Sequence, residues 1–107
     1  MDYQNYFKKK YSHIEYYDLE VLEGTAKEIL CHLLFKSTKT ISEENKKYAY
    51  EEYKFWILRC MQEMIERMGI TSAISYSENG VSIRFGSEQL SSALINEIVP
   101  ITRLGGH

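Results

Sequence analysis

Residues 70–98, ITSAISYSENGVSIRFGSEQLSSALINEI, carry the most specific structural signal in the chain. Asn79-Gly80 separates two stretches in which apolar and polar residues alternate. A two-residue type I′ turn needs positive φ at both central positions, so Asn-Gly between such stretches is the strongest short-range signal for a β-hairpin. We therefore expect a hairpin over residues 72–85.

A two-residue loop also fixes which residues face each other across the two strands. The expected pairs are Tyr76 with Ile83, Ile74 with Phe85, Ser75 with Arg84, and Ser77 with Ser82. A two-stranded hairpin is marginally stable by itself. Because this one carries no catalytic groups, it points to assembly with another surface.

A short helix is expected directly after the hairpin. Apolar residues recur there at helical spacing, at Leu90, Ala93, Leu94 and Ile98. Ser87, which follows Gly86, is the expected N-cap. The helix should end near Ile98, because Pro100 disfavours a helical conformation at Val99. The tail that remains, residues 99–107, is expected to be loosely ordered or to dock on another subunit.

The middle of the chain predicts one long central helix. Lys36–Thr40 is expected to be a connection, and Thr40 with Glu43 fits a capping box. The helix should then run to Met68, with Gly69 as the left-handed residue that ends it. Its expected core stripe is Ala49, Tyr53, Trp56, Ile57, Cys60, Met61, Met64, Ile65 and Met68.

A second helix is expected from Leu19 to about Phe35, with Asp18 as its N-cap. Its expected buried face consists of Leu22, Ala26, Ile29, Leu30, Leu33 and Leu34. Gly24 interrupts this helix at a cost of about 1 kcal/mol relative to alanine. The glycine marks either a close helix crossing or a kink.

The N-terminal segment, residues 1–17, interleaves tyrosines with Lys8, Lys9 and Lys10. One interpretation stacks nucleic-acid bases on the rings and pairs the lysines with phosphates. The other is a short amphipathic helix whose aromatic residues close the bundle while the lysines face solvent. Asp2, Glu15 and neighbouring acids dilute the positive charge, which favours the helix.

Length and composition predict one small, mainly α domain over residues 1–107. The content of 44% hydrophobic and 26% charged residues is ordinary for a globular chain. A net charge of −2 and a pI near 5.9 argue against a dedicated nucleic-acid-binding protein. No stretch has the length of a membrane span, and the N-terminus lacks the pattern of a secretory signal.

No motif in the sequence indicates an enzyme, a cofactor or a metal. There is no Gly-rich phosphate loop, no HExxH and no GxSxG. Cys31 and Cys60 fall inside helical patterns and are expected to be buried thiols. His13, His32 and His107 have no ligand spacing. We therefore expect no catalytic, cofactor-binding or metal-ligating residues.

The run of residues 69–106, GITSAISYSENGVSIRFGSEQLSSALINEIVPITRLGG, resembles the C-terminal part of head–tail connector proteins of tailed bacteriophages and prophages. The matching features are ERMG at the end of the long helix, SYSENGVSI in the hairpin, the short helix, and IVP at the start of the tail. The resemblance covers roughly Leu19 to Gly105. The segment from Tyr3 to Tyr17 has no match in the family.

The resemblance implies a head-completion or adaptor protein that forms a ring of about a dozen copies at the portal vertex, within the closed symmetries common to oligomers. Such a ring extends the DNA channel and joins the capsid to the tail. The implied partners are further copies of the chain, the portal protein and a downstream tail-side connector. Non-specific contact with DNA passing through the channel is also implied, and no membrane contact. The implied location is the bacterial cytoplasm during assembly and then the virion.

Within this interpretation the subunit interface is expected on the hairpin face and the tail. The expected interface residues are Tyr76, Glu78, Asn79, Val81, Ile83, Ile101 and Leu104. Lys36 and Lys39 are the candidates for the wall of the DNA channel. The alternative is a small helical protein–protein interaction or regulatory module of a mobile element, which would be dimeric and would form no ring.

Overall fold

The computed structural model describes residues 2–35, 41–68, 74–76, 83–85 and 88–99. In chain order the elements are α1 (Tyr3–Lys10), α2 (Tyr16–Leu34), α3 (Glu43–Glu52), α4 (Lys54–Glu63), a π-helical turn η1 (Met64–Met68), β1 (Ile74–Tyr76), β2 (Ile83–Phe85), β3 (Glu88–Gln89) and α5 (Ser92–Asn96). The fold is mainly α, which confirms the predicted fold class.

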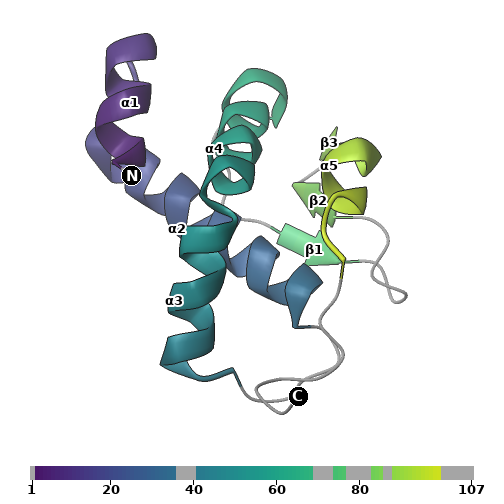
Figure 1. The fold of residues 1–107 in the computed structure, drawn as a ribbon. Helices are drawn as coiled ribbons and strands as arrows, with labels where there is room; N and C mark the ends of the chain where they lie inside the picture. Colours follow the sequence, from purple (N-terminus) through teal and green to yellow (C-terminus); the bar gives the residue numbers. More distant parts are fainter. Residues whose placement is uncertain (1, 36–40, 69–73, 77–82, 86–87, 100–107) are drawn as a thin grey trace.

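The arrangement places α2 behind α3 and α4, which follow each other nearly end to end (Figure 1). Helix α1 packs on α2, while the small sheet and α5 lie on the opposite side of α4 from α1 (Figure 1). One hydrophobic core joins these parts, because Phe7 of α1, Leu30 of α2, Ile57 of α4 and Leu94 of α5 belong to a single buried cluster. The C-terminal elements therefore share the core of the helices.

Helix α1 has a local cap at each end. The Asp2 carboxylate accepts a hydrogen bond from the Asn5 backbone N–H at 3.1 Å. At the other end, the Tyr11 backbone N–H donates to the Phe7 carbonyl at 2.7 Å, and the Lys8 ammonium holds the loop that follows by donating to the carbonyls of Ser12 and Ile14 at 2.9 and 2.6 Å. Tyr3 and Phe7 are buried, so the interpretation in which α1 closes the bundle is confirmed for these two rings.

Helix α2 begins at Tyr16, earlier than predicted, and its N-cap is Glu15. The prediction of Asp18 as N-cap is wrong, since Asp18 lies in the first helical turn. Contacts with α1 account for the earlier start: the Tyr16 hydroxyl donates to Asn5 Oδ1 at 3.1 Å, and the Lys8 ammonium lies 5.3 Å from the centre of the Tyr16 ring. All six residues of the predicted buried face are buried.

Gly24 is exposed in α2, and a β-carbon built there meets no atom within 4 Å. The predicted close helix crossing at this residue is therefore wrong. The glycine only lowers helix propensity and widens the conformational freedom of the unfolded chain.

Replacing Gly24 by alanine should raise the free energy of unfolding by about 1 kcal/mol, because alanine favours the helix and fills open space. Urea unfolding monitored by circular dichroism measures the change. Ala26→Gly, at a fully buried position of the same helix, should act in the opposite direction and serves as the control. A loss of stability in Gly24→Ala would contradict the assignment of open space at this site.

The predicted long helix is divided at Tyr53, whose φ and ψ are −109° and 26°. Backbone bonds continue through the division, from Tyr53 N to Ala49 O and from Ile57 N to Tyr53 O, both at 2.9 Å. The prediction of one uninterrupted helix is wrong here. No glycine or proline lies within four residues of Tyr53, and both halves of the segment pack on α2.

The start and end of the long helical segment also differ from the prediction. Ser42 is the N-cap of α3 and accepts from the Asn45 N–H at 3.1 Å, whereas Thr40 lies outside the described residues. After Glu63 the helix widens into η1, so the segment ends in a π turn and not in regular α-helix. The predicted end at Gly69 lies outside the described residues. Of the predicted core stripe, six residues are buried and Tyr53 and Ile65 are partly buried.

The sheet has the strand order β1-β2-β3, with both neighbours antiparallel. The pairs of β1 with β2 are Ile74 with Phe85, Ser75 with Arg84, and Tyr76 with Ile83. These are three of the four pairs expected from the sequence. The fourth pair, Ser77 with Ser82, and the Asn79-Gly80 turn lie outside the described residues.

The segment after β2 continues the sheet where a helix was predicted. Glu88 and Gln89 form β3, and the Leu90 N–H donates to the Ile83 carbonyl at 2.8 Å. Helix α5 starts at Ser92 with Ser91 as its N-cap, so the predicted start after Ser87 is wrong. The later start changes the buried face: Leu90, Leu94 and Ile98 are buried as predicted, but Ala93 is exposed and Ile95 is buried in its place.

Candidate functional site

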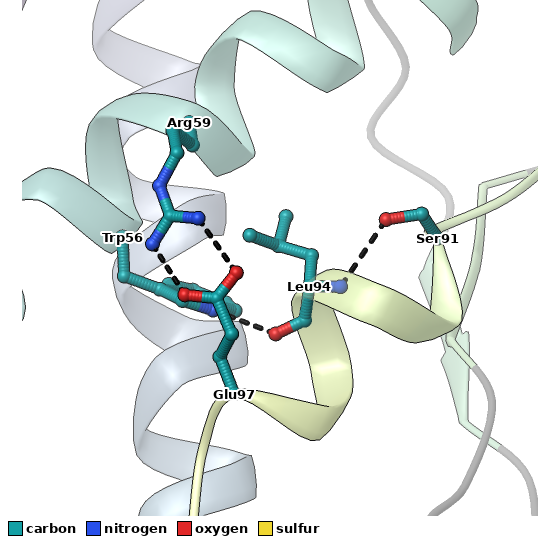
Figure 2. Close-up of polar contacts among 5 residues, drawn as sticks. All are labelled: Trp56, Arg59, Ser91, Leu94 and Glu97. Carbon is teal, nitrogen blue, oxygen red and sulfur yellow. Dashed lines mark hydrogen bonds and ion pairs between the residues drawn. The ribbon is translucent and has the colours of Figure 1, made fainter.

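Three residues on one face of α4 bind the C-terminal helix α5. Trp56, Arg59 and Glu63 lie three and four residues apart, which places them on one side of a helix. The Trp56 indole N–H donates to the Leu94 carbonyl at 2.8 Å, and the Trp56 side chain is 3% exposed. This bond satisfies the polar atom of an otherwise buried ring. We call Trp56, Arg59 and Glu63, together with their partners Ser91, Leu94 and Glu97, the α4–α5 junction. Figure 2 shows all of these residues except Glu63.

Arg59 and Glu97 form the outer part of the α4–α5 junction. The guanidinium donates two hydrogen bonds of 2.6 Å to the two carboxylate oxygens (Figure 2). This bidentate geometry is the strongest form of an arginine–carboxylate pair. Both side chains are about half exposed, so the pair fixes orientation more than it adds stability.

Glu63 forms the third part of the α4–α5 junction. Its carboxylate accepts from the Ser91 backbone N–H and from the Ser91 hydroxyl, the latter at 3.0 Å. The Ser91 oxygen in turn accepts from the Leu94 N–H at 3.3 Å and caps α5. Glu63 also accepts from Arg67 at 3.0 Å, within the same helical face. The start of α5 is therefore held by a side chain of the long helix.

The Arg59–Glu97 pair should make the stability of the folded chain depend on pH. The hydrogen bonds from Arg59 lower the pKa of the Glu97 carboxyl. A depressed pKa in the folded state gives stabilisation that is present above the ordinary carboxyl pKa and is lost as pH falls through the depressed pKa. Glu97→Gln should therefore lower the urea midpoint at about pH 7, and this effect should shrink when the pH is lowered to about 2. Equal effects at both pH values would contradict this; Glu52→Gln, an exposed carboxylate with no ion pair among the described residues, is the control.

The end of α4 and the turn η1 are also bonded to Tyr11, the residue that ends α1. The Tyr11 hydroxyl donates to Glu66 at 2.6 Å, and Gln62 donates to the same carboxylate oxygen at 3.0 Å. The hydrogen bond to Glu66 raises the pKa of Tyr11 to about 12 and lowers that of Glu66. Helix α4 and the π turn are thus bonded both to the end of α1 and to α5, and Gln62 and Glu66 border the same hollow as Arg59 and Glu63.

Lys27 links α1, α2 and α3. Its ammonium pairs with Glu23 at 2.8 Å and lies 5.9 Å from the Tyr3 ring centre and 5.0 Å from the Tyr50 ring centre. Tyr50 also accepts a weak bond from the Cys31 thiol at 3.8 Å. Burial raises the pKa of Tyr3 and of Tyr50 to about 12. These contacts hold three helices together and leave no reactive group in an open cleft.

Two exposed surfaces combine aromatic rings with charge. The first, the α1 patch, consists of Tyr6, Lys9 and Lys10, and it borders a hollow of about 640 Å³ that Asp2 and Asn5 complete. The second, the α3–α4 stripe, consists of Glu44, Tyr48, Glu52 and Phe55. Tyr48 is 57% exposed and Phe55 is 61% exposed. Exposed Tyr and Phe of this kind are typical of protein contact surfaces.

Most of the predicted interface lies outside the described residues. This holds for Glu78, Asn79, Val81, Ile101 and Leu104, and also for the channel candidates Lys36 and Lys39. Tyr76 belongs to β1, opposite Ile83.

Ile83 itself is fully buried in the core of its own chain. Its assignment to a subunit contact is therefore wrong, because its side chain is already covered. The alternation correctly predicted that Ile83 packs against another surface, but that surface belongs to the same chain.

The described residues provide no evident metal or nucleophile site. Within residues 2–35, 41–68, 74–76, 83–85 and 88–99, no group of three His, Cys, Asp or Glu residues could hold a metal ion. Cys31 and Cys60 are free and buried, as predicted, and burial raises the pKa of both thiols. A raised pKa reduces the thiolate fraction and with it the reactivity.

No helix in the part of the chain that the structure describes is long and apolar enough to cross a membrane. Comparisons with protein-family models, with curated proteins and with solved structures gave no match.

Proposed function

We propose that the chain is a head–tail connector or adaptor protein of a tailed phage or prophage, which forms a ring at the portal vertex and joins the capsid to the tail. The observation that carries this proposal is the run 69–106, whose order of motifs resembles the C-terminal part of that family. In this role the chain acts by assembly and carries out no reaction of its own.

The α4–α5 junction supports an assembly role. A subunit that transmits position from capsid to tail must hold its contact elements at a fixed angle. Here Trp56, Arg59 and Glu63 fix α5 against the long helical segment by hydrogen bonds from three successive turns. Ring closure then requires one surface of a copy to meet a different surface of the next copy.

The decisive experiment mixes the chain with a portal protein from the genome that encodes it. Connector subunits can stay monomeric until they meet the portal, so the mass of the free chain alone decides little. Native mass spectrometry of the mixture should show several copies of the chain on each portal oligomer. A chain that binds no portal and reaches at most a dimer would overturn the proposal.

Contact with DNA in the channel is tested separately. If Lys36 and Lys39 line the channel, replacing both by alanine should leave portal binding intact and weaken retention of packaged DNA, since lysines near phosphates contribute a salt-dependent attraction. Unchanged retention would remove DNA contact from the proposal without affecting the ring.

The alternative of a dimeric interaction module has an observation of its own. The exposed rings of Tyr48 and Phe55 fit a protein contact and require no ring. Sedimentation of the free chain separates the two functions when it is combined with the portal mixture. A stable dimer that does not bind the portal protein would favour the interaction module.

A further inference from the structure

Two glutamates of the α3–α4 stripe form no ion pair within the described residues, although Lys46 and Lys47 border the same hollow as Glu44. Glu43 pairs with Lys46 at 3.7 Å and Glu51 pairs with Lys54 at 3.2 Å. By contrast, Glu44 and Glu52 are exposed, and neither forms an ion pair within the described residues. Their positions alternate with the exposed rings of Tyr48 and Phe55 at spacings of three and four, so the four side chains follow one side of the helical segment.

The α1 patch is the opposite in charge and similar in aromatic content. Lys9 and Lys10 are exposed, and among the described residues neither ammonium lies within ion-pair distance of a carboxylate. Tyr6, which is 43% exposed, lies one turn away on the same helix. Together with Asp2 and Asn5 these side chains line the hollow of about 640 Å³, which has room for an aromatic ring.

The geometry points to a second copy of this chain as the partner of both surfaces: we propose that the α1 patch of one copy docks on the α3–α4 stripe of another. Two α1 patches, or two α3–α4 stripes, would bring like charges together, and such contacts are costly at an interface. The cross pairing places Lys9 and Lys10 against Glu44 and Glu52. Tyr48 and Phe55 then supply the apolar contact that a charge pair alone lacks.

This contact deepens the proposed function, because it rests on the chain being an assembling protein and names the surfaces that meet. It also moves the expected contact to described helices, away from the hairpin and tail. A contact between two different surfaces generates rings when the rotation closes. If the α1 patch of each of two copies docks on the α3–α4 stripe of the other, the result is a closed dimer.

Charge reversal tests the contact directly. Lys9→Glu with Lys10→Glu, and separately Glu44→Lys with Glu52→Lys, should each raise the dissociation constant of self-association at least about tenfold at low salt. The chain that carries all four changes keeps the net charge of the natural chain and restores complementarity. It should therefore regain association. Sedimentation equilibrium measures the three chains, with circular dichroism and thermal unfolding to show that each is folded.

Two further variants keep the test decisive. Glu20→Lys with Glu28→Lys makes the same charge change on exposed positions of α2 and should leave association unchanged. Tyr48→Ser with Phe55→Ser changes no charge and should weaken association without unfolding the chain, since both rings are exposed. A natural chain in which copies do not contact each other either alone or on the portal, four-residue reversal without rescue, or equal loss in the α2 control would each overturn the proposal.

The same variants separate this contact from the proposed function. If the charge-reversal series behaves as expected but the chain binds no portal, the contact stands and the connector function fails. If every variant still assembles on the portal, the connector function stands and the α1 contact fails.

Discussion

Replacing Trp56 by alanine should lower the free energy of unfolding by about 3–5 kcal/mol, the usual cost of removing a buried large aromatic side chain. Trp56 is 3% exposed and lies where α4 meets α5. The change leaves a cavity between the two helices and removes the indole bond to Leu94. For a small domain this loss is a large part of the total stability. Urea unfolding at neutral pH measures it.

Trp56→Phe is the matched control, because it keeps most of the ring and removes only the N–H donor. The Leu94 carbonyl would retain its weaker bond from the Glu97 N–H at 3.3 Å, so the loss should be about 1 kcal/mol. Hydrogen exchange localises the effect: the amides of Leu94 and Ile95 should lose protection in Trp56→Ala before those of α2. Unchanged protection in α5 would contradict the role of Trp56 in the α4–α5 junction.

The parts of the fold that depend on periodicity were predictable. The buried face of α2 follows directly from apolar spacing, and Trp56, Ile57, Cys60 and Met61 fall on the expected stripe of α4. The pairing of Tyr76 with Ile83 was also expected, since a two-residue turn fixes register. In these cases local sequence and tertiary packing require the same conformation.

The parts that depend on contacts between distant residues were not predictable. No residue near Tyr53 signals a division of the helix, since neither glycine nor proline lies there and the apolar spacing continues through it. The start of α5 was misplaced because Ser87 and Ser91 are both suitable caps. Ser91 is the N-cap in the structure, because its hydroxyl is bonded to the carboxylate of Glu63, which lies 28 positions away along the chain.

The candidate site was predictable only in part for the same reason. Sequence identified the lysines of the N-terminal segment and the tyrosines of the long helical segment. It did not show which of them lack partners, because ion pairs such as that of Glu51 with Lys54 depend on the folded side chains. Ile83 shows the converse error, since an apolar strand residue satisfied by its own core has the same sequence pattern as one at an interface.

Replacing Phe7 by alanine should also cost about 3–5 kcal/mol, because its ring is fully buried in the shared core. The ring contacts Tyr11 and Tyr6, with centres 6.2 and 5.0 Å apart. Tyr6→Ala, one residue away on the exposed side of α1, is the matched comparison and should cost only about 0.5–1.5 kcal/mol, the worth of its edge-to-face contact with Phe7. Thermal unfolding of the two variants provides the comparison.

The two variants together decide how α1 contributes. If α1 belongs to the core and presents the α1 patch, Phe7→Ala should reduce stability and self-association together. Tyr6→Ala should reduce self-association with a much smaller loss of stability, because it alters the patch while Phe7 still fills the core. Should Phe7→Ala leave stability unchanged, α1 would be an appended arm whose position the core does not fix. A patch on such an arm would have to be ordered on contact, and the entropy of that ordering would reduce the affinity that Lys9 and Lys10 can provide.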